Sequence, residues 1–379
     1  MRLTARQLNR ATLGRQLLLR RETLDAVEGV RRVVALQAQE PASVYIALWN
    51  RLAGFDPTDL DRAYAEHAVV KASLLRITLH AVTADDYPAF HQAMQFTLRA
   101  ARLNDGRFAV AGLSKADADA LLPAVLEFAV KPRSGAEMEA WLDDRLGVLP
   151  RPGVWWAMRT YAPLWHAPAT GPWTFRPKAA YTAARTTAAA DVDIAVQQLV
   201  RRYLAGFGPA SVADIAQFST IVRPPIHSAV EALGDELVRL EGPDGRELLD
   251  VPTGLLPAEG AAAPPRLMAM WDSVLFGHVG RERVVPAEYR GLVIRRNGDT
   301  LPTLLVDGYV AGVWRPLDGG IEATAFRPLS DDDWAGLETE AQGLLAFIGN
   351  RDAQVYRRYA RWWADLPAAE VRLLGRGSA

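Results

Sequence analysis

The sequence has no cysteine among its 379 residues. Disulfide bonds, thiolate metal sites and cysteine nucleophiles are therefore excluded, and the absence agrees with a reducing compartment. The sequence also has no apolar run of the roughly 20 residues that span a membrane. The first residues, Met1 to Thr4, do not lead into the apolar segment of a signal peptide. We therefore expect a cytoplasmic protein.

The chain has little net charge and few lysines. Its formal net charge is −1, and four of its 43 basic residues are lysines. A protein that merely coats nucleic acid is usually more basic. Arginine suits phosphate and base recognition better than lysine, although a GC-rich genome would give the same bias. The composition, 50% hydrophobic and 23% charged, is ordinary for a globular chain of two or three domains.

Familiar motifs of cofactor and metal chemistry are absent as well. The sequence contains no Walker loop, no Gly-x-Gly-x-x-Gly after a predicted strand, no His-Glu-x-x-His and no Gly-x-Ser-x-Gly. Its six histidines are scattered without the spacing of metal ligands. We therefore expect neither a metal ion nor a cofactor.

Two glutamines, Gln37 and Gln39, lie at the end of a predicted helix. Apolar residues recur at three- and four-residue steps over Asp25 to Leu36, and the next step falls on Gln37. Pro41 then interrupts the pattern and opens a second predicted helix, Ala42 to Leu52. The two glutamines are thus expected at a helix C-terminus, where the break lets their side chains converge.

This arrangement has a chemical use. An amide keeps its hydrogen-bond donors and its acceptor at any ordinary pH. Two amide oxygens beside the negative end of a helix dipole would hold a water molecule and stabilise a cationic, sugar-like transition state. The commoner alternative is structural, because a buried glutamine at a helix end usually caps the helix or bonds within the core.

The order of predicted elements indicates an α+β fold, mainly α, with three winged helix-turn-helix units. Each unit has helices followed by a strand pair, and the third, with Ser211 as an N-cap and a turn over Gly242 to Gly245, is the clearest. The expected units cover residues 1–112, 113–190 and 191–265, and a strand-rich part covers residues 266–379. Many winged helices serve only as packing modules, so each unit alone leaves DNA contact open.

The strand-rich part contains short β-rich segments. They are expected at Leu267–Trp271, Leu292–Arg296, Leu301–Val306, Tyr309–Arg315 and Ile321–Arg327. Asp307 and Gly308 predict a two-residue hairpin turn. Beyond them we expect helices over Asp331–Ile348 and Gln354–Leu366, and a frayed tail from Arg372. In the first unit, Leu75 to Val82 is expected to form one strand. Two arginine-rich runs, Arg281 to Arg296 and Arg351 to Arg361, would suit DNA phosphates, but a solvated, ion-paired surface is commoner.

Five segments together resemble the AlkZ/YcaQ family of tandem winged-helix DNA glycosylases. In order they are Gln37-Ala38-Gln39, Leu75 to His80, Gly208 to Ser211, Trp271 to Ser273 and Val306 to Arg315. The ordered set extends over nearly the whole chain. The resemblance implies three winged helices and a small C-terminal β-barrel, which wrap duplex DNA as a C-shaped monomer.

The resemblance also implies an active site. The family motif of glutamine, an apolar residue and glutamine falls on Gln37, Ala38 and Gln39, which makes Gln37 and Gln39 the expected catalytic residues. A second glutamine is typical of the branch that unhooks N7-linked interstrand crosslinks, in self-resistance to alkylating natural products such as azinomycin. The implied reaction is hydrolysis of the N-glycosidic bond of N7-alkylated purines. We expect no lyase step, because no lysine suggests itself near the glutamine pair.

The implied DNA contacts lie in the strand-rich part. Asp307, Gly308 and Tyr309 match the family hairpin that probes DNA beside the lesion, and Arg295 and Arg296 extend this surface. The expected partner is double-stranded DNA that contains alkylated or crosslinked purines. Two alternatives remain open. One is a non-enzymatic winged-helix regulator, usually a dimer on a palindromic site; the other is a drug-sequestering protein that uses the aromatic-rich segment Trp155 to Trp173.

Overall fold

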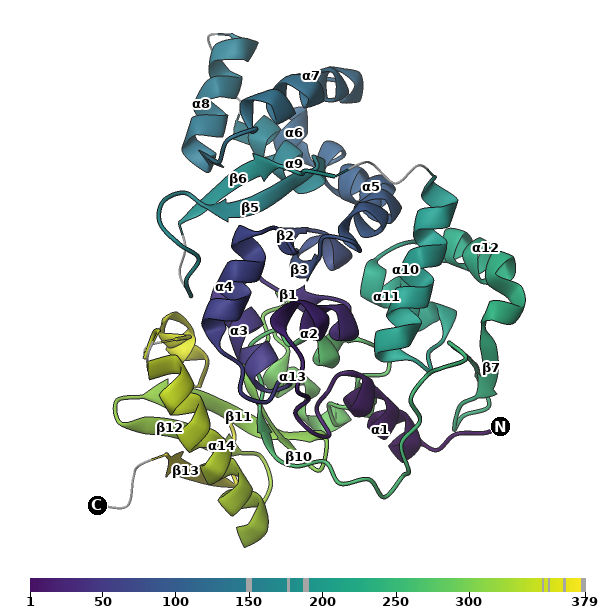
Figure 1. Ribbon diagram of the computed structural model, residues 1–379, viewed down its shortest axis with the longest axis vertical. Helices are drawn as coiled ribbons and strands as arrows, with labels where there is room; N and C mark the ends of the chain where they lie inside the picture. The colour runs from purple at the N-terminus through teal and green to yellow at the C-terminus, as the bar shows by residue number, and fades with distance from the viewer. Residues whose placement is uncertain are drawn as a thin grey trace.

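The computed structural model describes residues 1–147, 152–175, 178–186, 191–349, 351–353, 355–363 and 366–375. The N-terminal helices and a three-stranded sheet lie at the centre of the molecule (Figure 1). The helices are α1 (Ala5–Arg15), α2 (Ala26–Val33), α3 (Pro41–Trp49) and α4 (Pro57–Ala65). The antiparallel sheet has the order β1 (Leu36–Gln37), β3 (Leu79–Thr83), β2 (Val69–Ser73).

The helix before the glutamine pair ends earlier than predicted. It ends at Val33, because Val34 adopts a left-handed φ of 73°. Gln37 then pairs with His80 of β3 as a strand residue. The prediction of a continuous helix up to the first glutamine is therefore wrong, since apolar steps do not reveal pairing with a strand that follows much later. Pro41 opens α3 as predicted.

The predicted strand from Leu75 to Val82 is interrupted at its start. Leu75–Ile77 is a 3-10 turn, η1, in which Arg76 has a positive φ of 53°. Strand β3 begins only at Leu79. Side chains in this turn therefore do not alternate between two faces as they do in a strand. The turn places Arg76 Nη2 3.0 Å from His80 Nε2.

The second part forms a lobe above the centre in Figure 1. Its helices are α5 (Tyr87–Leu103), α6 (Gly106–Ala109), α7 (Lys115–Phe128), α8 (Gly135–Leu146) and α9 (Pro152–Tyr161). Its sheet has the order β4 (Arg133–Ser134), β6 (Ala179–Ala183), β5 (Leu164–Pro168). Ser134 caps α8 in a capping box with Glu137, as its spacing predicts. Helix α5 is not among the elements that the sequence pattern predicts.

The third part has the predicted order of helices and hairpin. Its elements are α10 (Val192–Phe207), α11 (Val212–Ser219), α12 (Arg223–Leu233), the 3-10 turn η2 (Gly234–Glu236), β7 (Val238–Glu241) and β8 (Glu247–Asp250). Ser211 caps α11 and forms a capping box with Asp214, which confirms its predicted role. Strands β7 and β8 form an antiparallel pair, so the predicted hairpin is confirmed.

The C-terminal part contains an open sheet of five strands. Its elements are β9 (Arg266–Leu267), η3 (Ser273–Phe276), η4 (Arg281–Arg283), η5 (Ala287–Tyr289), α13 (Arg290–Val293), β10 (Thr303–Val306), β11 (Tyr309–Leu317), β12 (Gly320–Ala325), α14 (Asp331–Gly349), η6 (Arg357–Trp363) and β13 (Glu370–Leu374). The order is β13-β12-β11-β10-β9. The predicted barrel is not closed, because no pairing joins the edge strands β13 and β9 among the described residues.

Other predictions for this part have mixed outcomes. Asp307 and Gly308 have positive φ of 49° and 80° and join β10 to β11, which confirms the two-residue hairpin. The predicted strand at Leu292 is wrong, since α13 and a turn occupy that segment. In the segment predicted as a helix after Gln354, the described residues form the 3-10 helix η6, while residues 354, 364 and 365 lie outside the described part. Arg372 belongs to β13 rather than to a frayed tail, of which residues 376–379 are not described.

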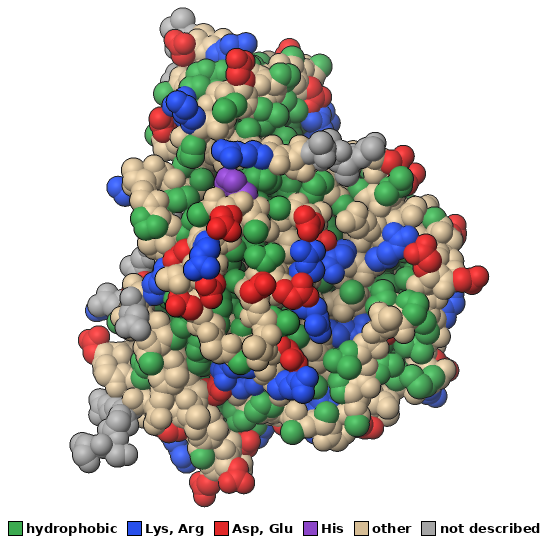
Figure 2. Space-filling view, viewed as in Figure 1, with side chains coloured by type: hydrophobic (Ala, Val, Ile, Leu, Met, Phe, Trp, Pro, Cys, Tyr) green, Lys and Arg blue, Asp and Glu red, His purple; other side chains and the backbone are tan. Residues whose placement is uncertain are grey.

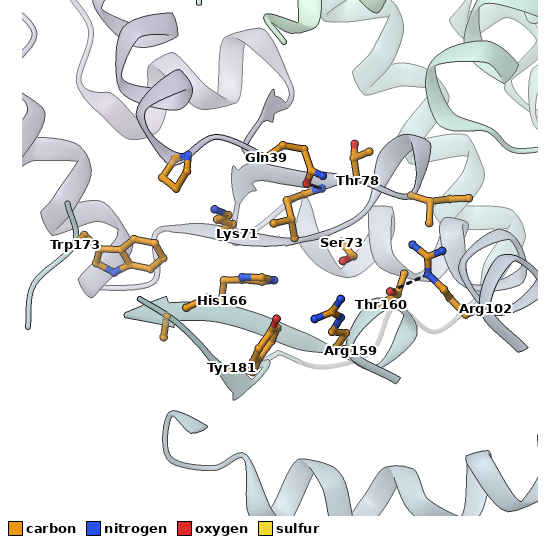
Figure 3. Close-up of a pocket in the computed structure, with 15 residues that line it drawn as sticks. Gln39, Lys71, Ser73, Thr78, Arg102, Arg159, Thr160, His166, Trp173 and Tyr181 are labelled. Carbon is orange, nitrogen blue, oxygen red and sulfur yellow. Dashed lines mark hydrogen bonds between the residues drawn. The ribbon is translucent and has the colours of Figure 1, made fainter. Parts of the chain in front are cut away.

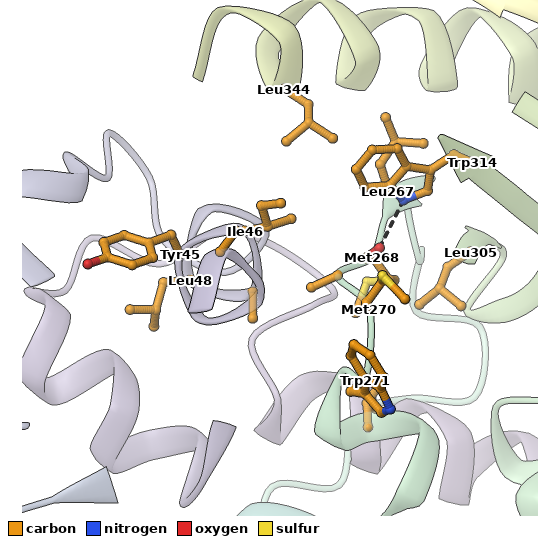
Figure 4. Close-up of a cluster of buried hydrophobic side chains, with 14 of the residues drawn as sticks. Tyr45, Ile46, Leu48, Leu267, Met268, Met270, Trp271, Leu305, Trp314 and Leu344 are labelled. Carbon is orange, nitrogen blue, oxygen red and sulfur yellow. Dashed lines mark hydrogen bonds between the residues drawn. The ribbon is translucent and has the colours of Figure 1, made fainter. Parts of the chain in front are cut away.

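Two large apolar clusters hold the parts together, and the N-terminal region contributes to both. In the first, side chains of α3 pack toward the open sheet and α14 (Figure 4). The second joins β2 to the helices of the upper lobe and to α10. The fold is thus α+β with the N-terminal sheet between its parts. The winged-helix arrangement and the unit boundaries stay predictions. No helix in the described part of the chain is long and apolar enough to cross a membrane.

Candidate functional site

The side chain of Gln37 belongs to a closed polar network. Gln37 is 7% exposed, and its Oε1 accepts a hydrogen bond from Arg76 Nη2 at 2.8 Å. Its backbone N–H donates to Ser273 Oγ at 3.3 Å. The same Arg76 nitrogen lies 3.0 Å from His80 Nε2. Gln37 therefore connects β1 to the η1 turn and to the start of η3.

Arg76 is a half-buried cation with neutral partners. Its guanidinium lies 5.0 Å from the ring of Phe218 and 5.2 Å from the ring of Phe276. Burial, and then the charge of Arg281, lowers the pKa of Arg76 to about 9, which leaves it protonated at neutral pH. Because arginine only donates, we assign His80 Nε2 as the acceptor. Its Nδ1–H then donates to Thr78 O, 3.1 Å away, and burial together with the Arg76 charge lowers the pKa of His80 well below its ordinary value.

Gln39 faces a different environment from Gln37. It is an exposed residue between β1 and α3, and its Oε1 accepts a hydrogen bond from the backbone N–H of Leu79 at 3.0 Å. No hydrogen bond joins the two glutamine side chains in the described part of the chain. Both are instead held by the segment from Arg76 to His80. Gln39 borders the cavity described below and Gln37 does not, so the expected convergence of the two side chains is not found.

A cavity of about 380 Å³ opens beside Gln39, between the central sheet and the upper lobe. Figure 3 shows the side chains of Lys71, Arg159, His166 and Tyr181 lying around the same space. Lys71 and Ser73 alternate along β2 and both line the cavity. Figure 2 shows basic side chains and histidine gathered between the lobe and the rest of the molecule.

The lining of the cavity is cationic. Lys71, Arg102 and Arg159 contribute positive charge, and no Asp or Glu is among the described residues that line it. Lys71 is 7% exposed; burial lowers its pKa to about 8, while the charge of Glu40 acts in the opposite direction. Burial, with the charges of Lys71 and Arg159, lowers the pKa of His166 to about 3, so the ring is neutral at ordinary pH.

Two premises drawn from the sequence do not hold in the structure. Because α2 ends at Val33, the nearest helix end to Gln39 is the N-terminus of α3, at Pro41, which carries partial positive charge. A negative dipole end therefore does not act on the glutamine pair. Lys71 lines the same cavity as Gln39, so the absence of a nearby lysine no longer supports the expectation that there is no lyase step.

The hairpin of Asp307, Gly308 and Tyr309 packs against α1. Arg6 donates to Asp307 Oδ2 at 2.7 Å, and Arg10 donates to Oδ1 of the same carboxylate. These hydrogen bonds lower the pKa of Asp307, although burial alone would raise it. Gly308 is buried, and a Cβ added there would lie 2.4 Å from a methyl group of Leu13. The hairpin tip is thus tied to the N-terminal helix, and Tyr309 is partly exposed beside it.

The two remaining candidates, Arg295 and Arg296, differ from each other. Arg295 Nη2 donates to the backbone carbonyl of Trp362 at 2.7 Å, so its guanidinium already has a partner. Arg296 is exposed in the turn that follows. Neither lines the cavity beside Gln39. Of the predicted DNA contacts, Arg296 therefore has the side chain that is freest to reach a phosphate.

Several residues of the cavity were not identified from the sequence. Lys71, Arg102, Arg159, His166 and Tyr181 come from β2, α5, α9, β5 and β6, which only the folded chain brings together. One local signal existed. A lysine and a serine alternate with apolar residues in β2, which is the pattern of a strand with one polar face.

Comparisons with known proteins show the family to which the chain belongs. The family model "DNA glycosylase AlkZ-like" matches residues 30–347. The chain therefore belongs to the AlkZ-like DNA glycosylase family, and the matched span includes both glutamines and the Asp307 hairpin.

A curated protein and a solved structure, both from Streptomyces sahachiroi, match the chain over most of its length. A curated protein named "Interstrand DNA cross-link repair glycosylase" is 26% identical over 347 residues, which cover 86% of this chain and 91% of that protein. The solved structure "Streptomyces sahachiroi DNA glycosylase AlkZ" matches with a TM-score of 0.80 at 22% identity, over 92% of this chain and 98% of that chain. The structural match shows a shared fold.

Proposed function

We propose that this protein is a monofunctional DNA glycosylase that hydrolyses the N-glycosidic bond of N7-alkylated purines, including those in interstrand crosslinks. Family membership and the crosslink-repair name of the curated relative support the reaction class. The observation that carries the proposal is the Gln39 amide, held by the Leu79 N–H at the wall of an open, water-accessible cavity.

Gln39 is proposed to orient the attacking water. Its carbonyl oxygen has a second lone pair beyond the one that faces the Leu79 N–H. The water attacks C1′ as the bond from C1′ to N9 breaks, and the water gives up one proton to the solvent in the open cavity. The purine departs as a neutral base, because N7-alkylation had already made it cationic. Such a leaving group needs little acid catalysis. The amide dipole also favours the positive charge that develops on the sugar.

Gln37 is proposed as a positioning residue rather than a group that touches the substrate. Its oxygen already accepts from Arg76, and Arg76 lies in the segment whose Leu79 N–H holds Gln39. Loss of Gln37 would therefore lower excision indirectly, by changing the conformation of this segment. The predicted winged-helix units, a monomeric C-shaped clasp on duplex DNA and the absence of a lyase step are parts of the same proposal.

The proposal is tested by base release from a duplex that holds one N7-methylguanine. Gln39→Ala is expected to lower excision by about 100-fold, the lower range for a group that orients a nucleophile, while DNA binding and thermal stability stay near wild type. Gln37→Ala is expected to lower excision less and to destabilise the fold by about 1–3 kcal/mol, because Arg76 loses its acceptor.

Three outcomes would decide against parts of this proposal. Equal excision by wild type, both single variants and the double variant would make the glutamine pair purely structural. A wild-type protein that binds this duplex and a crosslinked one without releasing base would favour a non-enzymatic regulator. Cleavage of the DNA strand after base release, without added alkali, would contradict the absence of a lyase step.

A further inference from the structure

We propose that the cavity beside Gln39 binds a backbone phosphate of the DNA strand that carries the lesion, with Lys71 as its central cation. This inference rests on the proposed glycosylase function and adds a site to it. The cavity is bordered by three cationic side chains from three elements: Lys71 of β2, Arg102 of α5 and Arg159 of α9. An anion is therefore the chemically matched ligand.

Lys71 supplies the strongest reason to expect a ligand. Lys71 is only 7% exposed, and its ammonium, which borders the open cavity, forms no hydrogen bond or ion pair with any residue in the described part of the chain. A largely buried charge without a protein partner is costly, and Glu40, the carboxylate whose charge acts on Lys71, is already engaged. Glu40 accepts a hydrogen bond from Arg358 and lies 3.5 Å from the hydroxyl of Tyr359. Lys71 is thus placed to contact a group that the protein itself does not provide.

The neighbours of Lys71 fit a phosphate better than a base. His166 and Tyr181 offer neutral polar groups, and Ser73 and Thr160 line the same space. Arg102 is held in place by donation from its Nε to Thr160 Oγ1 at 3.0 Å, which leaves its terminal nitrogens available. An N7-alkylated purine is itself cationic, so it would be repelled from this site. The phosphate beside the lesion carries the opposite charge.

A phosphate here would also serve the chemistry at Gln39. Gln39 and Lys71 line one cavity, so an anion bound to Lys71 would lie near the sugar whose positive charge develops as the bond breaks. Without it, three cations would oppose that charge. The bound strand would therefore convert a repulsive environment into an attractive one, and it would fix the sugar relative to the water on Gln39.

The test combines protein variants with duplexes in which single phosphates near the N7-methylguanine are replaced by neutral methylphosphonates. For wild type, one position is expected to lower excision by about tenfold, the effect of one charged hydrogen bond. For Lys71→Met, excision from the unmodified duplex is expected to fall by about the same factor, and neutralising that position should have no further effect. The slope of log affinity against log salt concentration should become shallower by the amount that corresponds to about one phosphate contact.

Three further measurements keep the inference separate from the proposed function. Lys115→Met removes an exposed lysine at the start of α7, away from the cavity, and should behave as wild type throughout. Lys71→Arg should restore part of the lost excision, because it retains the charge. Inorganic phosphate alone should raise the thermal unfolding temperature of wild type less than the duplex does.

Distinct results would overturn the inference. If wild type excises base but neutral phosphates and Lys71→Met lower excision independently, Lys71 does not contact the phosphate and the glycosylase function still stands. If borohydride traps Lys71 covalently on abasic DNA, its role is that of a nucleophile instead. If inorganic phosphate stabilises the protein as strongly as the duplex does, the site belongs to a free anion. If wild type releases no base at all, the proposed function itself fails.

Discussion

The two faces of the hairpin formed by β2, η1 and β3 differ in how their polar groups are partnered. On one face, Arg76 contacts Gln37 and His80, and Gln37 reaches Ser273, so polar groups satisfy one another. On the other face, Lys71 has no such partner among the described residues and borders a cavity. The first arrangement fixes the shape of the hairpin, whereas the second leaves charge available for a ligand.

This difference assigns separate roles to two glutamines that look equivalent in the sequence. Gln37 belongs to the face on which Arg76, His80 and Gln37 bond to one another, called the satisfied face below, and Gln39 belongs to the cavity face. Substitutions on the satisfied face should therefore reduce stability first and activity second. Substitutions on the cavity face should reduce DNA contact or excision while the fold remains intact.

The largest expected effect concerns the buried ion pair next to the satisfied face. Both side chains of Arg51 and Asp272 are completely buried, and they form two hydrogen bonds of 2.8 Å each. Asp272→Asn would leave the Arg51 charge buried without its partner, so we expect a loss of about 3–5 kcal/mol in the free energy of unfolding. Denaturant titration measures it. Asp272 directly precedes Ser273, so excision should fall in parallel with the folded fraction.

A matched control separates burial from charge. Glu247→Gln removes a carboxylate that pairs with Arg239 across β7 and β8, where both side chains are more than half exposed. An exposed pair contributes about 0–1 kcal/mol, so this variant should unfold near the wild-type midpoint. If Asp272→Asn lowered the free energy of unfolding as little as Glu247→Gln does, the Arg51–Asp272 pair would not stabilise the fold.

The next effect concerns the hairpin that was predicted to probe DNA. Asp307 is half exposed, but its partner Arg10 has a fully buried guanidinium. Asp307→Asn is expected to lower the free energy of unfolding by about 1–3 kcal/mol, less than a fully buried pair because water screens the carboxylate. Arg6→Gln, at a partly exposed position, should change stability by less. Weaker DNA binding at unchanged stability would instead support direct contact between Asp307 and DNA.

Parts of the fold could be predicted because their signals are local. Ser134 and Ser211 occupy capping boxes, Pro41 opens a helix, and Asp307-Gly308 forms its hairpin turn. Each of these depends on a few adjacent residues and on backbone preferences that act within one turn. Such features follow from the sequence without knowledge of the rest of the chain.

Other parts depend on contacts between distant segments and were therefore missed. The three- and four-residue spacing of apolar residues predicts that Gln37 ends a helix, but pairing with His80 makes it a strand residue. The cavity needs β2, α5 and α9 to meet, so neither Lys71 nor Arg159 carries a local signal of its role. The family resemblance identified Gln39 but not the cationic wall opposite it.

The smallest expected effect is a pH dependence confined to the cavity face. The titratable or charged groups that face Lys71 are Glu40, Arg102, Arg159, His166 and Tyr181. Because burial lowers the pKa of Lys71 to about 8, the free protein loses this charge as the pH rises through that value. His166 is already neutral there, since its pKa lies near 3.

Affinity for a duplex should be constant below pH 7 and fall by about fivefold between pH 7.5 and 9.5, because a bound phosphate favours the protonated amine. Fluorescence anisotropy titrations measure this dependence. Lys71→Arg should abolish the decline, since arginine stays charged over this range, and an unchanged decline in that variant would mean that another group titrates and that Lys71 does not contact DNA.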